Sequence, residues 1–249
     1  MTAAKKVDFL VAGAQKSGTS ALDAYLREHP ELCFPRQKEL HFFDKDRLFI
    51  TEPVDYARYH ALFDPKPPQR LLGESTPAYL YWPQAVERIA RYNPAMRFII
   101  VLRNPVTRAF SHWNYERLVH KEDLDFLDAL RAYPERRRRM PARRAKRFAY
   151  VDRGCYVGQI RRLWAHFPPE QTLLFKTEAL LETPSAVLDR TASFLGIAPF
   201  PPVAPKMRNT REYDTTMSEE AKSFLVETYR DEIGELERLL GWDCSSWLA

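Results

Sequence analysis

Short apolar runs alternate along the chain with segments of helical spacing. Val7, Phe9, Leu10 and Val11 form one such run, and residues 98–102 form another. Continuous runs of this length are typical of strands that are buried on both faces of a parallel sheet. A further strand is expected from Leu173 to Glu178. The pattern predicts an α/β fold in which helices flank a central parallel sheet.

Helical spacing follows each of the first two runs. After the first run, the apolar positions recur as Leu22, Tyr25, Leu26 and His29, and Pro30 stops the pattern. After the second, Pro105 suits the first turn of a helix with a core stripe of Val106, Ala109, Phe110 and Trp113. This stripe leaves Arg108, Ser111 and His112 on another face of the same helix.

A third helix is expected near the end of the chain. Thr216 and Glu219 have the spacing of a capping box at its start. Its apolar stripe is expected to comprise Ala221, Leu225, Tyr229, Ile233 and Leu236.

A polar turn with two glycines joins the first strand to the first helix: Gly13-Ala14-Gln15-Lys16-Ser17-Gly18-Thr19. The free amides and positive dipole end of such a helix favour an anion, and Lys16, Thr19 and Ser20 add charge and hydroxyl donors. A Walker motif has its lysine directly after the second glycine, whereas Lys16 precedes Gly18 by two residues. The turn is therefore interpreted as a phosphate site that differs from an ATPase loop.

A second phosphate signal follows the second strand. Arg103 lies at the end of that strand, and Ser111 lies on the helix after it. Turns after parallel strands meet at one edge of the sheet, where ligands bind in such folds. We expect Arg103 and Ser111 to reach one phosphate.

Length and composition favour one intracellular domain. The 249 residues show neither a linker-like shift in composition nor a repeat, so residues 1–249 are expected to form a single domain. No apolar stretch approaches the roughly 20 residues that span a bilayer, and the first residues lack a secretory apolar core. The expected location is cytoplasmic, without a membrane span.

Cysteine and arginine usage narrow the classes of function. Cys33, Cys155 and Cys244 are too scattered for a zinc site or a disulfide framework, and we expect buried apolar side chains. The net charge of +5 is concentrated in residues 131–147, which hold nine basic residues and one acidic residue. This segment is interpreted as a solvated helix or loop, with an anionic-substrate surface as the alternative. Nucleic-acid binding is disfavoured, because the nearby aromatic residues do not interleave with the arginines.

Four motifs together resemble the sulfotransferases that use 3′-phosphoadenosine 5′-phosphosulfate (PAPS), especially the heparan sulfate N- and 3-O-sulfotransferases and their bacterial relatives. The first is the polar turn, and the second is Glu39-Leu40-His41-Phe42-Phe43-Asp44. The third is Gly73-Glu74-Ser75-Thr76-Pro77-Ala78-Tyr79, and the fourth is Arg103-Asn104-Pro105 with Arg108 and Ser111. The resemblance implies a P-loop-like sulfotransferase fold, with transfer to a hydroxyl or amine of a small-molecule or carbohydrate acceptor and no metal.

The resemblance also implies roles for single residues. Gln15, Lys16, Ser17, Gly18, Thr19 and Ser20 would bind the 5′-phosphosulfate, and Lys16 would stabilise the leaving group. Arg103 and Ser111 would bind the 3′-phosphate, and a late loop with Arg208, Asn209, Thr210 and Arg211 would close over the nucleotide. Glu39 would be the general base, with His41 as the competing base or acceptor ligand.

Two other functions stay open at this point. A divergent P-loop kinase would need ATP and magnesium, and a non-catalytic module would bind a nucleotide or a polyanion without transfer. Neither the acceptor nor the oligomeric state follows from the sequence.

Overall fold

Within the described part of the chain, the strands form one parallel sheet. The computed structural model describes residues 5–119, 121–203 and 213–249. Within them, five strands pair in the order β2-β3-β1-β4-β5, and every pairing is parallel. The strands are β1 (Phe9–Gly13), β2 (Leu32–Cys33), β3 (Leu71–Ser75), β4 (Arg97–Leu102) and β5 (Thr172–Lys176).

The helices connect these strands and continue beyond them. They are α1 (Thr19–Leu26), α2 (Ala57–His60), α3 (Ala78–Tyr81), α4 (Pro83–Tyr92), α5 (Pro105–Leu118), α6 (Phe126–Arg139), α7 (Ala142–Ala145), α8 (Tyr156–Trp164), α9 (Thr177–Glu182), α10 (Pro184–Leu195) and α11 (Glu219–Leu240). The predicted α/β class is therefore confirmed.

The chain divides into two compact units. The first unit comprises Met1–Leu102 and Arg161–Thr210 and contains the sheet, and the second comprises Arg103–Ile160 and Arg211–Ala249 and is helical. The assignment of residues 1–249 to one domain stays a prediction.

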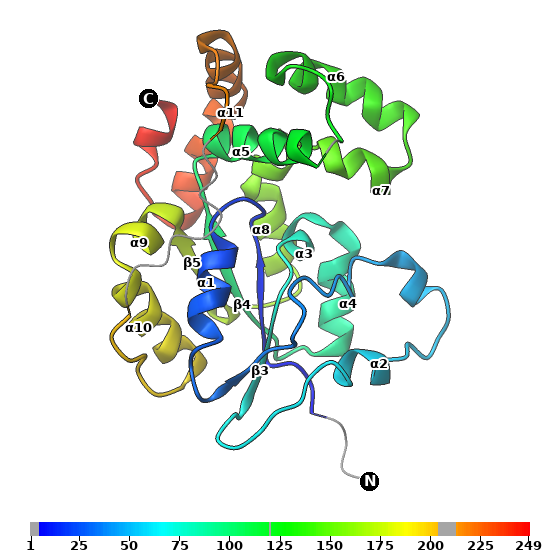
Figure 1. Cartoon of the computed structure of the whole chain (residues 1–249), viewed down its shortest axis with the longest axis vertical. Coiled ribbons are helices and arrows are strands. Elements are labelled where there is room, and N and C mark those ends of the chain that lie inside the picture. Colours follow the sequence, from blue (N-terminus) through cyan, green and yellow to red (C-terminus); the bar gives the residue numbers. More distant parts are fainter. Residues whose placement is uncertain (1–4, 120, 204–212) are drawn as a thin grey trace. The chain divides into compact units, whose positions relative to one another are not determined.

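The first unit has its main core on one face of the sheet. Phe9 and Val11 from β1 and Ile99 and Val101 from β4 pack there with apolar side chains from α1, α9 and α10, and α3 and α4 lie on the other side (Figure 1). Successive side chains of a strand point to opposite faces of the sheet. Residues of one strand therefore supply both faces, which explains why these strands lack a polar face.

Strands β1 and β4 confirm the first two predicted runs. Strand β5 confirms the third, but it ends at Lys176, because Thr177 and Glu178 begin α9. Helix α1 begins at Thr19, directly after the polar turn, but ends at Leu26, so the expectation that the helix includes His29 is wrong. The His29 side chain instead completes a turn, where its Nδ1 accepts from the Glu31 amide at 3.2 Å and its Nε2 lies 3.0 Å from the Ala198 carbonyl. Its burial comes from these contacts, although its spacing imitates a helix.

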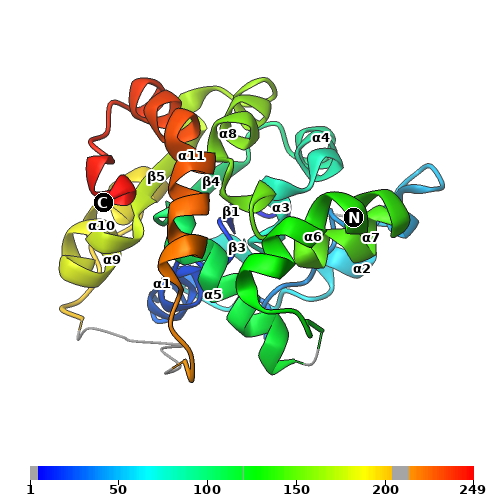
Figure 2. The same ribbon diagram turned by 90° about the horizontal axis from the view of Figure 1, so that it is seen from above.

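In the second unit α11 contacts α5 and runs across its direction (Figures 1 and 2). The buried residues of α11 are Ala221, Leu225, Tyr229, Ile233 and Leu236, as predicted. The predicted cap is wrong: Ser218, not Thr216, is the N-cap, and its hydroxyl accepts from the Ala221 amide at 3.2 Å. The helix begins at Glu219, so only Ser218 is placed to accept from its third amide.

Helix α5 is buried on more sides than its apolar stripe predicts. Arg108, Ser111 and His112 are all buried, although the sequence places them away from the stripe. Arg108 donates to the Tyr150 carbonyl, and the His112 ring packs edge-on against the Tyr150 ring with centroids 4.9 Å apart. The polar face of α5 is buried because residues 148–150 cover it and because the Tyr150 carbonyl accepts a hydrogen bond from Arg108.

Candidate active site

The turn after β1 has the backbone of an anion site. Gly18 is the N-cap of α1 with a φ of 95°, and Lys16 has a φ of 70°. Positive φ values are rare for residues with a side chain and gather at functional turns. The first amides of α1 have no partners within the helix, and they point with the positive end of the helix dipole toward the turn.

The two glycines of the turn serve different purposes. Gly18 needs a left-handed conformation, as expected, whereas Gly13 is required for space. A Cβ at Gly13 would lie 2.7 Å from the Leu80 side chain of α3. Gly13 therefore permits the close packing of β1 against α3.

Thr177 at the start of α9 fixes the turn to the sheet. Its hydroxyl lies 2.8 Å from the Ser17 carbonyl and 3.1 Å from the carbonyl of Leu102, the last residue of β4. The backbone of Ala14 donates to Val101 at 2.8 Å. The turn is thus held at the carboxyl ends of neighbouring strands, where open parallel sheets bind ligands.

The side chains of the turn fit a phosphosulfate group. Lys16, Thr19 and Ser20 supply an ammonium and two hydroxyls, and the buried Ser17 hydroxyl, which can donate, has no hydrogen-bond partner within the described residues. The Gln15 Oε1 atom also lacks a partner there, but as an acceptor it does not bind phosphate oxygens. A buried polar atom without a partner costs free energy unless a ligand or water satisfies it. Hydroxyls, an ammonium and helix amides are the donors that phosphate and sulfate oxygens accept from.

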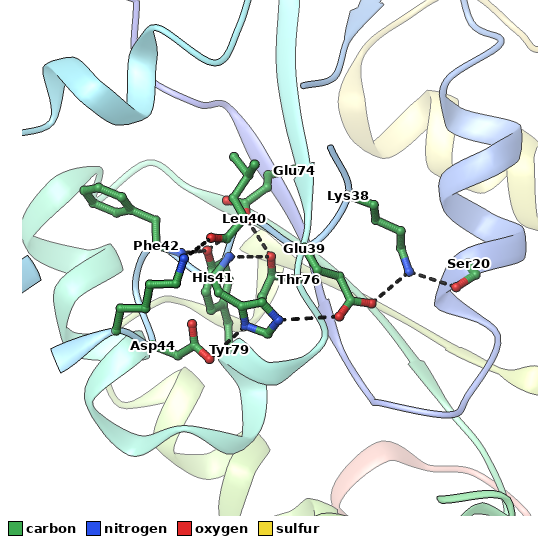
Figure 3. Close-up of polar contacts among 11 residues, drawn as sticks. Ser20, Lys38, Glu39, Leu40, His41, Phe42, Asp44, Glu74, Thr76 and Tyr79 are labelled. Atoms are coloured by element: carbon green, nitrogen blue, oxygen red, sulfur yellow. Dashed lines mark hydrogen bonds and ion pairs between the residues drawn. The ribbon is translucent and has the colours of Figure 1, made fainter. Parts of the chain in front are cut away.

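A second loop of the same unit carries Glu39 and His41. Both residues have left-handed backbones, with φ values of 60° and 54°, so this segment is not an extended strand. The Glu39 amide donates to the carbonyl of Ser75, the last residue of β3, at 3.0 Å. The loop is therefore attached to a strand adjacent to β1. The two side chains still meet, because Glu39 Oε2 and His41 Nε2 lie 3.6 Å apart (Figure 3).

Two cations surround the Glu39 carboxylate. Lys38 Nζ lies 3.1 Å from Glu39 Oε1, on the other side from His41. Burial by itself raises the pKa of Glu39, but the contact with His41 and the charge of Lys38 outweigh it and hold this pKa below its ordinary value. Glu39 is therefore ionised at neutral pH.

His41 is a cation at neutral pH. Its Nδ1 lies 2.9 Å from Asp44 Oδ2, and Asp44 is buried. The contact with Asp44, followed by that with Glu39, raises the pKa of His41 to about 9. An imidazolium has no free lone pair to accept a proton, so of the two candidate bases only Glu39 has the required protonation state.

The buried carboxylate of Glu74 supports the loop that carries Glu39 and His41. Glu74 on β3 is fully buried and accepts hydrogen bonds from Tyr59, from Thr76 at 2.5 Å and from Tyr79 at 2.8 Å. Burial raises the pKa of Glu74 despite these donors. The Tyr79 hydroxyl in turn accepts from the Phe42 amide at 2.9 Å. Two hydrogen bonds therefore connect Glu74 to the backbone between His41 and Asp44.

The second phosphate signal lies in the second unit. Arg103 donates through Nε to the Thr107 hydroxyl at 3.0 Å, and its carbonyl accepts from Tyr156 at 2.8 Å. The Ser111 hydroxyl lies 2.8 Å from that of Tyr213. That Arg103 and Ser111 share one phosphate stays a prediction, and Arg208, Asn209, Thr210 and Arg211 lie outside the described residues.

The arginine-rich segment forms most of α6 and α7. Arg136 pairs with the buried Glu122, and Arg138 and Arg139 pair with Glu135 on the exposed face of α6. The helical interpretation is confirmed, while the anionic-substrate surface stays untested. Cys33 and Cys244 are buried as expected, whereas Cys155 is only partly buried.

The described residues were also considered as a metal site and as a membrane span. They contain no group of three or more His, Cys, Asp and Glu side chains that could hold a metal ion. Within the same residues, none of the helices combines the length and the apolar character that a membrane crossing requires.

The structure brings together residues that the sequence treats separately. Glu39 and His41 meet as a pair, and Lys38 connects Glu39 to Ser20, which follows the phosphate turn. No individual role is predicted from the sequence for Lys38, Thr177 or Glu74. Lys38 has one signal in the sequence, its position directly before Glu39, whereas contacts of Thr177 with residues 75 and 160 positions away leave no local pattern.

Known proteins resemble this chain over nearly its whole length. A human bifunctional heparan sulfate N-deacetylase/N-sulfotransferase 3 is 28% identical over 279 residues, covering 96% of this chain and 31% of that protein. A human heparan sulfate glucosamine 3-O-sulfotransferase 6 is 32% identical over 188 residues, covering 76% of this chain and 52% of that protein. The chain therefore spans about a third to a half of the length of these relatives.

Solved structures share the fold. The crystal structure of a sulfotransferase from Alicyclobacillus acidocaldarius has a TM-score of 0.83 at 28% identity, covering 98% of this chain and all of that one. The mouse sulfotransferase SULT7A1, complexed with PAP, has a TM-score of 0.50 at 18% identity, with 78% and 60% of the two chains covered. The model of the sulfotransferase domain family matches residues 6–232. Because this match covers most of the chain, the chain belongs to the sulfotransferase family.

Proposed function

We propose that this protein transfers a sulfuryl group from PAPS to a hydroxyl or amine of a small-molecule or carbohydrate acceptor. One observation carries the proposal: Lys38 joins the ionised Glu39 to Ser20 in the first turn of α1. A base and an anion site that share a cation are suited to activating a nucleophile next to a bound anionic group. A binding module assigns no role to Glu39, and a P-loop kinase is disfavoured because Lys16 precedes Gly18 instead of following it.

The donor is assigned to residues whose chemistry fits it. Lys16 with the hydroxyls of Thr19 and Ser20 would hold the 5′-phosphosulfate, and Arg103 and Ser111 would hold the 3′-phosphate. When bound, PAPS supplies an activated sulfuryl group and a phosphate leaving group. The Lys16 ammonium would stabilise the negative charge that develops on this phosphate, which is why no metal is expected.

Glu39 is proposed as the general base. Its carboxylate is ionised and would take the proton of the acceptor as the new bond to sulfur forms. His41 is proposed as a positioning cation, held by Asp44, that orients Glu39 Oε2. The protonated state of His41 supports this division of roles.

The acceptor class rests on the relatives. The human relatives named above are heparan sulfate enzymes, and a carbohydrate acceptor is therefore the first to test. The exposed arginines of α6 are a proposed contact for an acidic acceptor, and the cytoplasmic location is kept as a proposal for cell fractionation.

The first experiment measures the donor site by calorimetry. Adenosine 3′,5′-bisphosphate (PAP) is titrated into wild type and Arg103→Ala, with AMP and with ATP plus magnesium as controls. We expect wild type to prefer the bisphosphate and Arg103→Ala to lose that preference while it still binds AMP. A preference for ATP with magnesium would overturn the proposal in favour of a kinase.

Transfer is measured separately with ³⁵S-labelled PAPS and a panel of hydroxyl and amine acceptors, including heparan sulfate oligosaccharides. Label transfer to any acceptor confirms catalysis. Tight binding of the bisphosphate without transfer, across a panel that covers both acceptor types, would instead support a binding module.

A further inference from the structure

Lys38 contacts two parts of the first unit: the start of α1, next to the proposed donor site, and Glu39, the proposed base. Its Nζ atom lies 2.8 Å from Ser20 Oγ on α1 and 3.1 Å from Glu39 Oε1 (Figure 3). Ser20 follows the phosphate turn directly, and Glu39 is the proposed base. A single ammonium group therefore contacts both the donor site and the base.

The position of this cation is electrostatically unusual. The amino-terminal end of a helix carries a partial positive charge, and a lysine beside it is unfavourable unless an anion lies there too. Within the described residues, the carboxylate that contacts Lys38 is Glu39. Glu39 thus balances a positive site formed by Lys38 and the start of α1, and a bound anion can do the same.

The contact is also open to a ligand. Lys38 and Ser20 line a polar pocket of about 470 Å³, together with Asp23, Arg27 and Arg36. The Lys38 side chain is about a quarter exposed. An incoming group can therefore reach the ammonium without unfolding the loop.

We propose that Lys38 is a catalytic residue that binds the oxygens of the transferring sulfuryl group and, in doing so, releases Glu39 to act on the acceptor. This inference rests on the proposed function. Without donor, Lys38 holds Glu39 in an ion pair; with donor, the sulfuryl oxygens replace the Glu39 carboxylate as the partner of the ammonium.

The reaction step balances without any change in the protonation of Lys38. The acceptor hydroxyl or amine gives its proton to Glu39, and its lone pair forms the new bond to sulfur. The bond between sulfur and the bridging oxygen breaks, and its electron pair stays on the 5′-phosphate. Lys38 stabilises the charge on the sulfuryl oxygens throughout, because preformed charges act most strongly where charge shifts during the reaction.

The test compares two ligands that differ only by the sulfuryl group. Calorimetry measures the affinities of PAPS and of PAP, without acceptor, for wild type, Lys38→Met, Lys38→Arg and Lys66→Met. Lys66 is an exposed lysine that pairs with Asp64 at 3.5 Å, and it serves as the matched control.

We expect Lys38→Met to bind PAPS roughly 10- to 100-fold more weakly, as for a lost hydrogen bond to a charged group, and to bind PAP as wild type does. Lys38→Arg should retain part of the preference for PAPS, and Lys66→Met all of it. The unchanged affinity for PAP also shows that the variant is folded.

Two results overturn the inference. An unchanged affinity of Lys38→Met for PAPS would show that the ammonium does not touch the sulfuryl group, and an equal loss for both ligands would show that Lys38 only supports the loop. Either result leaves the proposed function standing if wild type binds PAP and transfers label. If wild type binds neither ligand, the proposed function itself fails.

Discussion

His41 Nδ1 lies 2.9 Å from Asp44 Oδ2, and this contact makes the imidazole a cation that faces Glu39. The ordinary pKa of histidine, 6.5, would leave the ring largely neutral at pH 7, whereas its pKa here is raised to about 9. The charge of His41 therefore depends mainly on the buried Asp44 carboxylate, with a smaller contribution from Glu39.

Replacement of Asp44 should move the alkaline limit of activity. A histidine with a raised pKa keeps its charge below that pKa and loses it as the pH rises through it, so wild-type kcat/KM should fall above about pH 9. In Asp44→Asn the pKa of His41 falls toward its ordinary value, and the decline should begin at a lower pH than in wild type. A pH profile of both proteins measures this, and identical alkaline limits would show that the charge of His41 is not needed.

Glu39→Gln should fold, bind PAP and lose turnover by roughly 10² to 10⁴, the scale of general-base catalysis. The amide keeps the size of the side chain but cannot take a proton. Single-turnover transfer of label measures the chemical step, and Glu87→Gln on the exposed face of α4 is the matched control. Near-normal turnover of Glu39→Gln would remove Glu39 from the mechanism.

Tyr79→Phe should loosen the loop that carries His41. The change removes a donor to the buried Glu74 and the acceptor of the Phe42 amide, and an unsatisfied buried group costs about 1–3 kcal/mol. We expect a lower free energy of unfolding in urea and a lower kcat, with PAP affinity retained. Tyr115→Phe, at an exposed tyrosine of α5, should change neither quantity. A kcat equal to that of wild type would mean that the loop does not need this support.

Thr177→Val should weaken donor binding. The hydroxyl that joins Ser17 to the end of β4 is lost, while valine keeps the shape of the side chain. PAP affinity measured by calorimetry should fall, because the turn must then be ordered by the ligand itself. Thr183→Val is the control, since its hydroxyl bonds only to Ala179 on an exposed helix end. Equal affinities for both variants would contradict the role of Thr177.

Arg136→Met should destabilise the second unit without a direct effect on binding. Arg136 pairs with Glu122, which is fully buried and also accepts from Tyr150 at 2.9 Å. Removal of one partner of a buried ion pair costs about 3 kcal/mol or more, so the urea midpoint should drop. Arg138→Met, at an exposed arginine, should leave the midpoint unchanged. If Arg138→Met instead weakens acceptor binding, the arginines of α6 contact the substrate.

The sequence by itself determined those strands and helices whose buried residues repeat at the spacing of one strand or one helix. The runs that became β1, β4 and β5 and the stripe of α11 repeat at the spacing of one strand or one helix, so each reveals its buried face without knowledge of its neighbours. Gly18 likewise follows from local geometry, because its φ of 95° favours glycine.

Tertiary structure decided which polar side chains meet. Lys38 reaches Ser20 across 18 residues, and Thr177 reaches Ser17 across 160, and no local period encodes such distances. The same reason explains one error: His29 is buried by a contact with the distant Ala198, and its helical spacing therefore placed it wrongly in α1. The sequence by itself specified a candidate anion site in the turn after β1 and a candidate base, Glu39. Only the packed chain placed the Lys38 ammonium between them and charged His41 through Asp44.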